Sequence, residues 1–169
     1  QPVVSALWQT ETTPVTAPYT TVMTWRIESF TDINGNKDKE FTHFLDLPKH
    51  VEVKFRLAVN GPMDLLRRKG WNPEPAMGLS KTIHDYRQFI SNSRAEFAVA
   101  KHAYIAHHSG WFSDRTECYL SAGRPAIVQD TGWTHHLPTG LGLLPFSTLP
   151  EAIAAIENVE SDYSRHALH

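Results

Sequence analysis

The chain has 169 residues, a net charge of −2 at pH 7 and a single cysteine. A weakly acidic composition without a long run of Lys or Arg argues against a nucleic-acid partner. The lone cysteine excludes an internal disulfide and a cysteine-only metal site, which favours a cytoplasmic protein. No apolar stretch approaches the roughly 20 residues that a membrane-spanning helix needs.

The amino-terminal segment, residues 1–20, is rich in Thr, Pro and Ser, and its prolines break any helix: Pro2, Pro14 and Pro18. We therefore predict an extended arm or interdomain linker over residues 1–20, followed by a single domain over residues 21–169. The chain begins at Gln1 rather than Met, and its last residues still read as helix. This suggests a fragment of a longer protein.

The first half of the predicted domain alternates strands with helices. Residues 20–27 are β-branched and aromatic enough for a core strand, and residues 34–36 form a polar turn. Asp38 can cap a helix that runs to about Leu47. Residues 51–59 alternate apolar with polar side chains, which predicts a strand near a sheet edge.

The middle of the chain repeats this order. Pro62 suits the first position of a short helix that ends at Gly70, and the prolines of residues 71–77 exclude a regular helix there. A helix follows over residues 81–92 with one apolar stripe: Ile83, Tyr86, Phe89 and Ile90. Residues 95–100 then form a short strand.

Residues 109–132 contain a turn, a capped helix, a second turn and a buried strand. Gly110 permits a close approach of backbone to ligand, and Ser113 or Asp114 can cap a helix that Gly123 ends. The free N–H groups at such a helix start attract anions. Residues 126–128 form an apolar strand, and residues 129–132 open at its carboxyl end, the edge where ligands bind in open α/β sheets. A phosphorylated ligand is therefore expected here.

The last segment adds a strand and a helix. Residues 143–147 are apolar, and Pro145 suits an edge strand. Thr148 and Glu151 form a capping box, and apolar side chains recur at helical spacing after it: Leu149, Ile153, Ile156 and Val159. The complete order predicts an α/β fold with a mainly parallel sheet and helices on both faces.

Residues 110–128 resemble the carboxyl-terminal, nucleotide-sugar donor-binding domain of GT-B glycosyltransferases of the glycosyltransferase 1 family. The resemblance rests on the Gly110–Trp111 turn, a helix near Ser113 that ends in Ala-Gly-Arg-Pro, and the apolar strand that follows. It extends more loosely from about Thr21 to the carboxyl end. It implies a Rossmann-like three-layer domain that binds a nucleotide-diphosphate sugar as substrate, without a separate cofactor.

The resemblance also implies site residues. Backbone N–H groups from Phe112 to Arg115 would hold the diphosphate, and the Arg115 side chain would add a charged contact. Many family members bind the ribose through a Glu where this chain has Cys118. Glu117 is its neighbour but points about 100° away around the helix. Asp130 or Thr131 is the alternative sugar contact, with Gly132 in the same loop.

Other candidates at this edge have competing interpretations. His108 is a phosphate or sugar candidate, and Lys101, just beyond the 95–100 strand, is a second phosphate candidate. Asp114 serves as a helix cap or a ligand contact, with the cap favoured because a carboxylate repels a diphosphate. Trp111 and Trp133 stack on a ligand or belong to the core, and Phe112 is assigned to the core.

The remaining reactive side chains receive structural interpretations. Adjacent histidines point in different directions, so the doublets at 107–108 and 135–136 do not predict a metal site. Cys118 lies among apolar neighbours and is interpreted as a buried structural thiol rather than a nucleophile. Two arginines are expected in solvent: Arg94 and Arg124.

A GT-B enzyme needs a second, acceptor-binding domain, which would have to precede Gln1. We therefore expect this chain to bind donor and to transfer no sugar by itself. The alternative is a non-catalytic α/β binding or assembly module, in which the helix start at residue 113 is only a structural turn. A receiver-like domain is disfavoured, because the sequence lacks the acidic cluster that such domains carry at their strand ends.

Overall fold

A six-stranded, fully parallel sheet forms the centre of the molecule. The computed structural model describes residues 7–8, 16–24, 37–79 and 81–167, and the side chains of residues 22–24 and 38 are not described. The strand order is β3-β2-β1-β4-β5-β6. Chain connectivity reverses direction between β1 and β4. The strands are β1 (Tyr19–Thr24), β2 (Phe55–Asn60), β3 (Pro73–Glu74), β4 (Ala95–Ala98), β5 (Ala126–Gln129) and β6 (Leu143–Phe146).

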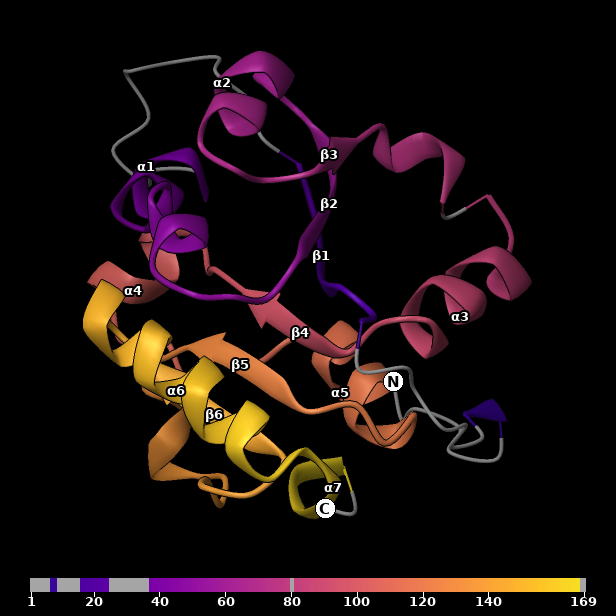
Figure 1. Cartoon of the computed structure of the whole chain (residues 1–169). Coiled ribbons are helices and arrows are strands. Elements are labelled where there is room, and N and C mark those ends of the chain that lie inside the picture. Colours follow the sequence, from indigo (N-terminus) through magenta and orange to yellow (C-terminus); the bar gives the residue numbers. More distant parts are fainter. Residues whose placement is uncertain (1–6, 9–15, 25–36, 80, 168–169) are drawn as a thin grey trace.

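Helices cover both faces of this sheet (Figure 1). One layer holds α1 and α6, and the opposite layer holds α3 and α5. The α/β, Rossmann-like three-layer architecture expected from the sequence is therefore confirmed. The helices are α1 (Lys37–Phe41), α2 (Met63–Arg68), α3 (Ile83–Ser91), α4 (His102–Ala106), α5 (Asp114–Ser121), α6 (Leu149–Ser161) and α7 (Tyr163–Ala167).

The larger core lies between the sheet and the layer of α1 and α6. Aromatic rings from four strands and the turn after α1 fill it, and Phe97 of β4 stacks on Phe146 of β6 with ring centres 5.0 Å apart. The second core joins the sheet to Phe89 and Ile90 of α3 and Tyr119 of α5. All four residues of β4 and of β5 are buried, as expected for strands covered on both faces.

Helix boundaries follow the predicted signals at the carboxyl half of the chain. Ser113 caps α5 through its hydroxyl, which accepts from the Arg115 N–H group, and Gly123 ends the helix with φ of +65°. Thr148 and Glu151 form the predicted capping box of α6. These local predictions are confirmed. Sequence was sufficient for them because each cap depends only on residues within one turn of a helix end.

Three predictions in the first half were wrong in detail. The helix predicted from Asp38 begins at Lys37 and ends at Phe41, and 3-10 turns Thr42–Phe44 and Leu47–Lys49 replace its second half. The strand predicted over residues 51–59 begins only at Phe55. Its predicted position near a sheet edge agrees with the structure, where it lies beside the edge strand β3. Pro62 is the cap of α2 rather than its first residue. The predicted turn at 34–36 lies outside the described residues.

Two segments differ from their predicted environment. Ile83, assigned to the apolar stripe of α3, is 78% exposed because it stands at the first position of the helix. Trp8, within the predicted arm, packs edge-on against Tyr86 with ring centres 6.5 Å apart. β1 begins at Tyr19, so Tyr19 and Thr20 of the predicted arm belong to the sheet.

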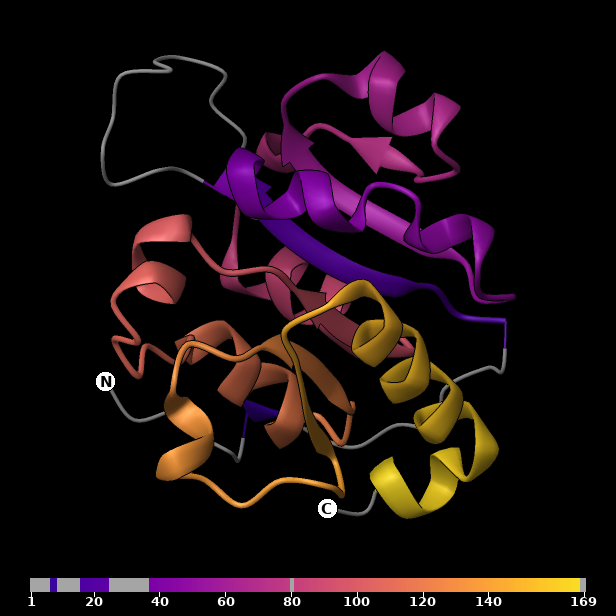
Figure 2. The ribbon, with the colours of Figure 1, turned by 90° about the vertical axis from the view of Figure 1, so that its left-hand side faces the viewer.

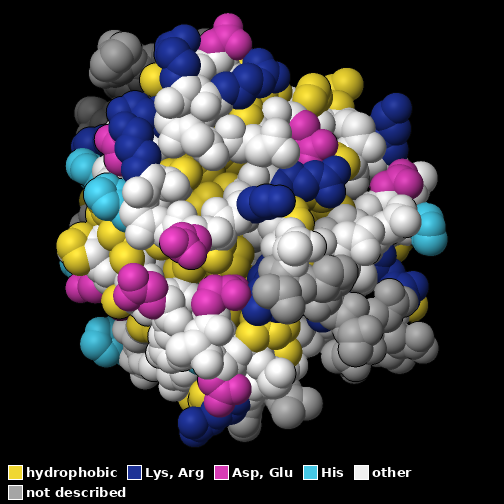
Figure 3. All heavy atoms as spheres, in the orientation of Figure 1, with side chains coloured by type: hydrophobic (Ala, Val, Ile, Leu, Met, Phe, Trp, Pro, Cys, Tyr) yellow, Lys and Arg dark blue, Asp and Glu magenta, His cyan; other side chains and the backbone are white. Residues whose placement is uncertain are grey.

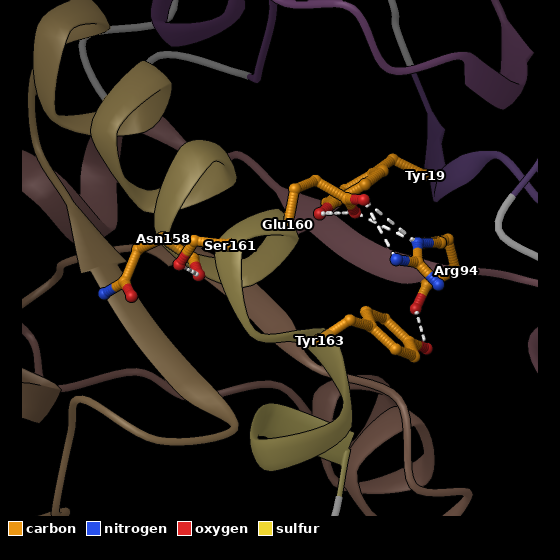
Figure 4. A network of polar contacts seen from close by, with 6 residues as sticks. All are labelled: Tyr19, Arg94, Asn158, Glu160, Ser161 and Tyr163. Carbon is orange, nitrogen blue, oxygen red and sulfur yellow. Dashed lines mark hydrogen bonds and ion pairs between the residues drawn. The ribbon is translucent and has the colours of Figure 1, made fainter.

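The amino edge of the sheet is held by a polar network (Figure 4). Arg94, directly before β4, makes a two-pronged ion pair with Glu160 of α6, at 2.9 Å between Nη2 and Oε2. The Tyr19 hydroxyl donates to the same carboxylate over 2.9 Å, and the Arg94 guanidinium lies 3.5 Å from the centre of the Tyr163 ring. The network ties the last helices to the sheet.

Two arginines are therefore not in solvent, contrary to the sequence prediction. Arg94 is buried against Glu160 and Tyr163, and Arg124 is buried with its Nη2 donating to the Ser91 carbonyl over 2.8 Å. Sequence alone missed both because each partner is supplied by another helix, 33 to 66 positions away along the chain.

Candidate functional site

The carboxyl edge of the sheet gathers the residues that the sequence singled out. In Figure 2 this edge faces the viewer, with α1, α4 and the start of α5 around it. It contains the point between β1 and β4 where connectivity reverses. Open α/β sheets bind ligands at such a point, because the loops on either side diverge and leave a crevice.

Two loops at this edge are joined by direct hydrogen bonds. The Gly110 N–H group donates to the Thr131 carbonyl over 2.8 Å, and the Thr131 hydroxyl donates to the Trp111 carbonyl over 2.7 Å. Gly132 has φ of +98°, and a Cβ there would lie 3.2 Å from the carbonyl oxygen of His108. The loop before α5 and the loop after β5 therefore form one rigid unit.

The Asp130 carboxylate forms hydrogen bonds within the loop after β5. One carboxylate oxygen accepts from the Gly132 N–H group over 2.8 Å, and the other accepts from the Thr134 hydroxyl over 2.8 Å. Thr131 is itself buried. Sugar recognition by Asp130 or Thr131 stays a prediction, and both side chains already have partners within the protein.

The start of α5 presents backbone donors. The Arg115 N–H group is used by the Ser113 hydroxyl, at 3.3 Å, and by an Asp114 carboxylate oxygen, at 3.0 Å. Within the described part of the chain, the N–H groups of Phe112, Ser113 and Asp114 have no hydrogen-bond acceptor. Three adjacent donors at a helix start are suited to an anion. Of the four predicted donors, three therefore have no acceptor among the described residues.

Arg115 is engaged with a buried carboxylate. Its Nε donates to Glu96 Oε1 over 2.7 Å, and the Glu96 side chain is 0% exposed. Burial is the largest single effect and lowers the pKa of Arg115, but the charge and hydrogen bond of Glu96 together with Tyr119 and Tyr86 outweigh it and raise that pKa. The other Glu96 oxygen has no hydrogen-bond partner among the described atoms. The Arg115 guanidinium therefore balances the charge of Glu96, and a contact between Arg115 and a phosphate remains a prediction.

Lys101 begins a row of stacked side chains. Its ammonium lies 5.8 Å from the centre of the Tyr104 ring, and that ring stacks on Trp111 with centres 4.8 Å apart and planes 19° apart. Lys101 is exposed and Trp111 is half-buried. The row connects the end of β4 to the loop before α5, so Lys101 and Trp111 belong to the same site.

Positive charge accumulates at this edge. Burial lowers the pKa of Lys37, at the start of α1, to about 7, and the charges of Arg115 and Lys101 act in the same direction while Glu96 opposes them. In Figure 3, Lys and Arg side chains gather over α1 and α2, with histidines beside them near α4. Lys39 of α1 and Lys101, directly before α4, are exposed, whereas Lys49 and Arg67 are ion-paired with Asp46 and Asp64. An anionic ligand would meet an attractive field here.

The side chains on α5 beyond its first turn have separate environments. Glu117 is exposed, and Cys118 is half-buried against the cluster around Phe89 and Tyr119. Burial, reinforced by the neighbouring Asp114 and Glu117 carboxylates, raises the pKa of Cys118 to about 11. A protonated thiol is a poor nucleophile, which agrees with the structural interpretation of Cys118.

The aromatic candidates divide between core and edge. Trp133 is 1% exposed, and its Nε1 donates to the Gln129 carbonyl over 3.1 Å. Phe112 packs edge-on against it with ring centres 5.4 Å apart. Trp133 is therefore a core residue, whereas the half-buried Trp111 keeps a surface on which a ligand can stack. His108 is exposed, with φ of +44°, in the same loop.

The structure also brings together residues that sequence reasoning missed. Glu40 of α1, His102 of α4 and Gln129 of β5 form a hydrogen-bonded chain at this edge, with Lys39 at its outer end. α4 itself was not predicted, because its five residues carry no apolar stripe. The sequence did offer one signal for this site, the Lys101-His102 pair that follows the buried strand. Residues at the carboxyl end of a strand lie at the edge where parallel sheets bind ligands.

Two further features bear on where a ligand binds. No group of three or more His, Cys, Asp or Glu side chains with metal-site geometry occurs within residues 7–8, 16–24, 37–79 and 81–167. A surface pocket of about 350 Å³ lies at the amino edge, with Tyr19, Lys54, Arg94 and Glu160 among its lining residues. Arg94 and Glu160 neutralise each other there, so the carboxyl edge is the better anion site.

Comparisons with known proteins give a likeness in structure and none in sequence. Neither family models nor curated proteins match the chain. A solved structure described as the crystal structure of the GtfA/B complex is similar to it, with a TM-score of 0.49 and 15% sequence identity over 95% of this chain. The chain spans 33% of the length of that protein's chain. Among the described helices, none is long and apolar enough to cross a bilayer.

Proposed function

We propose that this domain binds the nucleoside-diphosphate part of a nucleotide sugar, as the donor-binding half of a glycosyltransferase. One observation carries the proposal. The segment that resembles a donor-binding motif in sequence forms a helix start at the carboxyl edge of the sheet, where the N–H groups of residues 112–114 have no acceptor among the described residues. A diphosphate provides the charge and the acceptor oxygens that such donors need.

The surrounding charges support an anionic ligand. Lys101 and Lys37 lie near the helix start, and Arg115 is compensated by Glu96. In glycosyl transfer, negative charge builds up on the departing diphosphate, and fixed donors directed at that charge lower the barrier. The chain's contribution to catalysis would therefore be stabilisation of the leaving group.

The remaining elements of the reaction lie on a second domain in this proposal. An acceptor held there would receive the sugar, and the described side chains at the carboxyl edge would hold only the donor. Sugar transfer by this chain alone would contradict that division.

Binding can be tested by thermal unfolding in the presence of nucleoside diphosphates. ADP, GDP, UDP and CDP at 1 mM are compared with the corresponding nucleosides, which lack the charge. A diphosphate with a Kd of about 10 μM stabilises the fold by about 2.7 kcal/mol, an increase of several degrees in Tm. Stabilisation by a diphosphate and not by its nucleoside supports the proposal. No stabilisation by any of the four favours a non-catalytic binding or assembly module.

A further inference from the structure

A chain of four hydrogen bonds lies beside the proposed diphosphate site, on the α1 side of the sheet. The Ala100 N–H group donates to Gln129 Oε1 over 3.0 Å, and Gln129 Nε2 lies 2.8 Å from Glu40 Oε2. Glu40 Oε1 is 2.6 Å from His102 Nδ1, and His102 Nε2 is 2.7 Å from Lys39 Nζ. The chain runs from the buried end of β4 to the exposed Lys39.

The direction of each hydrogen bond is fixed by the chemistry of its ends. A backbone N–H group can only donate, so the Gln129 carbonyl oxygen faces Ala100 and its amide NH₂ faces Glu40. A carboxylate can only accept, so His102 Nδ1 carries the proton. An ammonium can only donate, so His102 Nε2 accepts from Lys39. The chain therefore defines a neutral His102 with its proton on Nδ1.

The buried part of this chain is rigid and the outer part is accessible. The Glu40 side chain is 8% exposed, whereas the His102 side chain is 23% exposed and Lys39 lies at the surface. Glu40 is thus a fixed base for the imidazole ring. The Lys39 ammonium is held only by a ring nitrogen in the described structure, and a long exposed side chain can turn away at little cost.

The pair lies at the same edge of the sheet as the predicted diphosphate contacts. His102 directly follows Lys101, which begins the stacked row to Trp111. Lys39 lies on the same short helix as Lys37, whose charge is coupled to Arg115 at the start of α5. The starts of α1, α4 and α5 thus meet at the same edge of the sheet.

We propose that Lys39 and His102 form a phosphate-binding pair that takes up one proton when it receives the terminal phosphate of a nucleoside diphosphate. This inference rests on the proposed function. It adds a second group of phosphate contacts to the helix start at residues 112–114, and it assigns a proton to the binding step.

The proton balance follows from the same donor rules. A deprotonated phosphate oxygen can only accept, so it attracts the Lys39 ammonium away from His102 Nε2. To donate to the phosphate, Nε2 must gain a proton, which comes from solvent or buffer. The resulting imidazolium keeps Nδ1–H on the Glu40 carboxylate, which balances its charge. The charged groups around the ring are Lys39 and Glu40 from α1 and the neighbouring Lys101.

The test uses ¹⁵N NMR of the imidazole rings of the whole chain at pH 7.5. The chain has ten histidines, so the His102→Asn spectrum identifies the His102 signals by difference. Asn retains a donor toward Glu40 and removes Nε2, which leaves the rest of the chain intact. The free protein should show His102 as the neutral ring with the proton on Nδ1. Saturating inorganic pyrophosphate, or ADP, GDP, UDP or CDP, should convert it to imidazolium.

Affinity gives the second measurement. His102→Asn and Lys39→Met should each weaken diphosphate binding by about tenfold or more, as expected for loss of a hydrogen bond to a charged group. Lys81→Met, an exposed lysine just before α3, is the control and should change affinity less than twofold. A uniform loss for all lysine variants would indicate only long-range attraction and would overturn the inference.

The failures of the two proposals are distinguishable. If a diphosphate binds and shifts other resonances while the His102 ring stays neutral, the phosphate-binding pair is wrong and the proposed function stands. Unchanged affinity of His102→Asn has the same meaning. If neither pyrophosphate nor any nucleoside diphosphate binds, both proposals are wrong.

Discussion

The Thr131 hydroxyl donates a hydrogen bond to the Trp111 carbonyl over 2.7 Å and thereby joins the loop after β5 to the loop before α5. Thr131→Val keeps the shape of the side chain and removes this donor, which leaves the partly buried Trp111 carbonyl with one partner fewer. We expect a loss of about 1 kcal/mol in unfolding free energy, measured by urea denaturation. Thr139→Val, at an exposed position beyond this loop, is the comparison and should leave the unfolding free energy unchanged. No loss of stability in Thr131→Val would show that the two loops are held by other contacts.

Gly132 has a left-handed backbone conformation, with φ of +98°, and lies next to the His108 carbonyl. In Gly132→Ala, the added Cβ would approach that oxygen to 3.2 Å, in a backbone conformation unfavourable for alanine. We expect destabilisation by about 1 to 3 kcal/mol together with weaker diphosphate binding, since the loop before α5 must move. Gly140→Ala is the matched control: Gly140 also has positive φ, but a Cβ there contacts nothing within 4 Å. Equal effects of the two variants would contradict the role of the His108 contact.

The Arg115–Glu96 pair should be strongly coupled, because Glu96 is fully buried and one of its oxygens has no hydrogen-bond partner among the described residues. Arg115→Met leaves that carboxylate without compensation, and we expect a loss of about 3 kcal/mol in unfolding free energy. The double variant with Glu96→Gln should recover most of it. A double-mutant cycle measures the coupling directly. Additive effects of the two substitutions would show that the pair is not coupled.

The pKa of Lys37, lowered to about 7, predicts a pH dependence of ligand binding. Above pH 7 the amine in the free protein is mainly neutral, and a bound diphosphate would favour its charged form. Binding near pH 8 should therefore take up a proton at Lys37, and affinity should fall as the pH rises from 7 to 9. Calorimetry in two buffers with different ionisation enthalpies measures the uptake.

Lys37→Met provides the control for that experiment, because it should remove the Lys37 share of the proton uptake and leave the share assigned to His102. The same total uptake in wild type and Lys37→Met would contradict the predicted link between Lys37 and the ligand.

Local signals in the sequence were sufficient for the helix ends and the buried strands. Ser113, Gly123 and Thr148 act within one turn of a helix, so the residue type alone identifies the boundary. They also place residues 109–132 at the carboxyl edge of the sheet, where the phosphorylated ligand stays a prediction. The polar contacts that define the site depend instead on how distant elements are aligned.

Arg115 illustrates this limit, because its role is decided by Glu96, a charged residue inside a strand that the sequence pattern treats as core. The His102–Glu40 contact likewise joins residues 62 positions apart on two short helices. No periodicity in the sequence reports such a contact, since neither α1 nor α4 has an apolar face long enough to fix its orientation. Only the packed sheet brings these side chains together.

The claim that a diphosphate binds at the start of α5 is tested most directly at Asp114, the first residue of that helix. Proline is compatible with this position and with the extended Ser113 before it, so Asp114→Pro removes one backbone donor without breaking the helix. Asp114→Ala removes the same carboxylate and keeps the donor. Calorimetric titration with the best-binding nucleoside diphosphate should give an affinity about tenfold lower for Asp114→Pro than for Asp114→Ala. Equal affinities for the two variants would contradict diphosphate binding at this helix start.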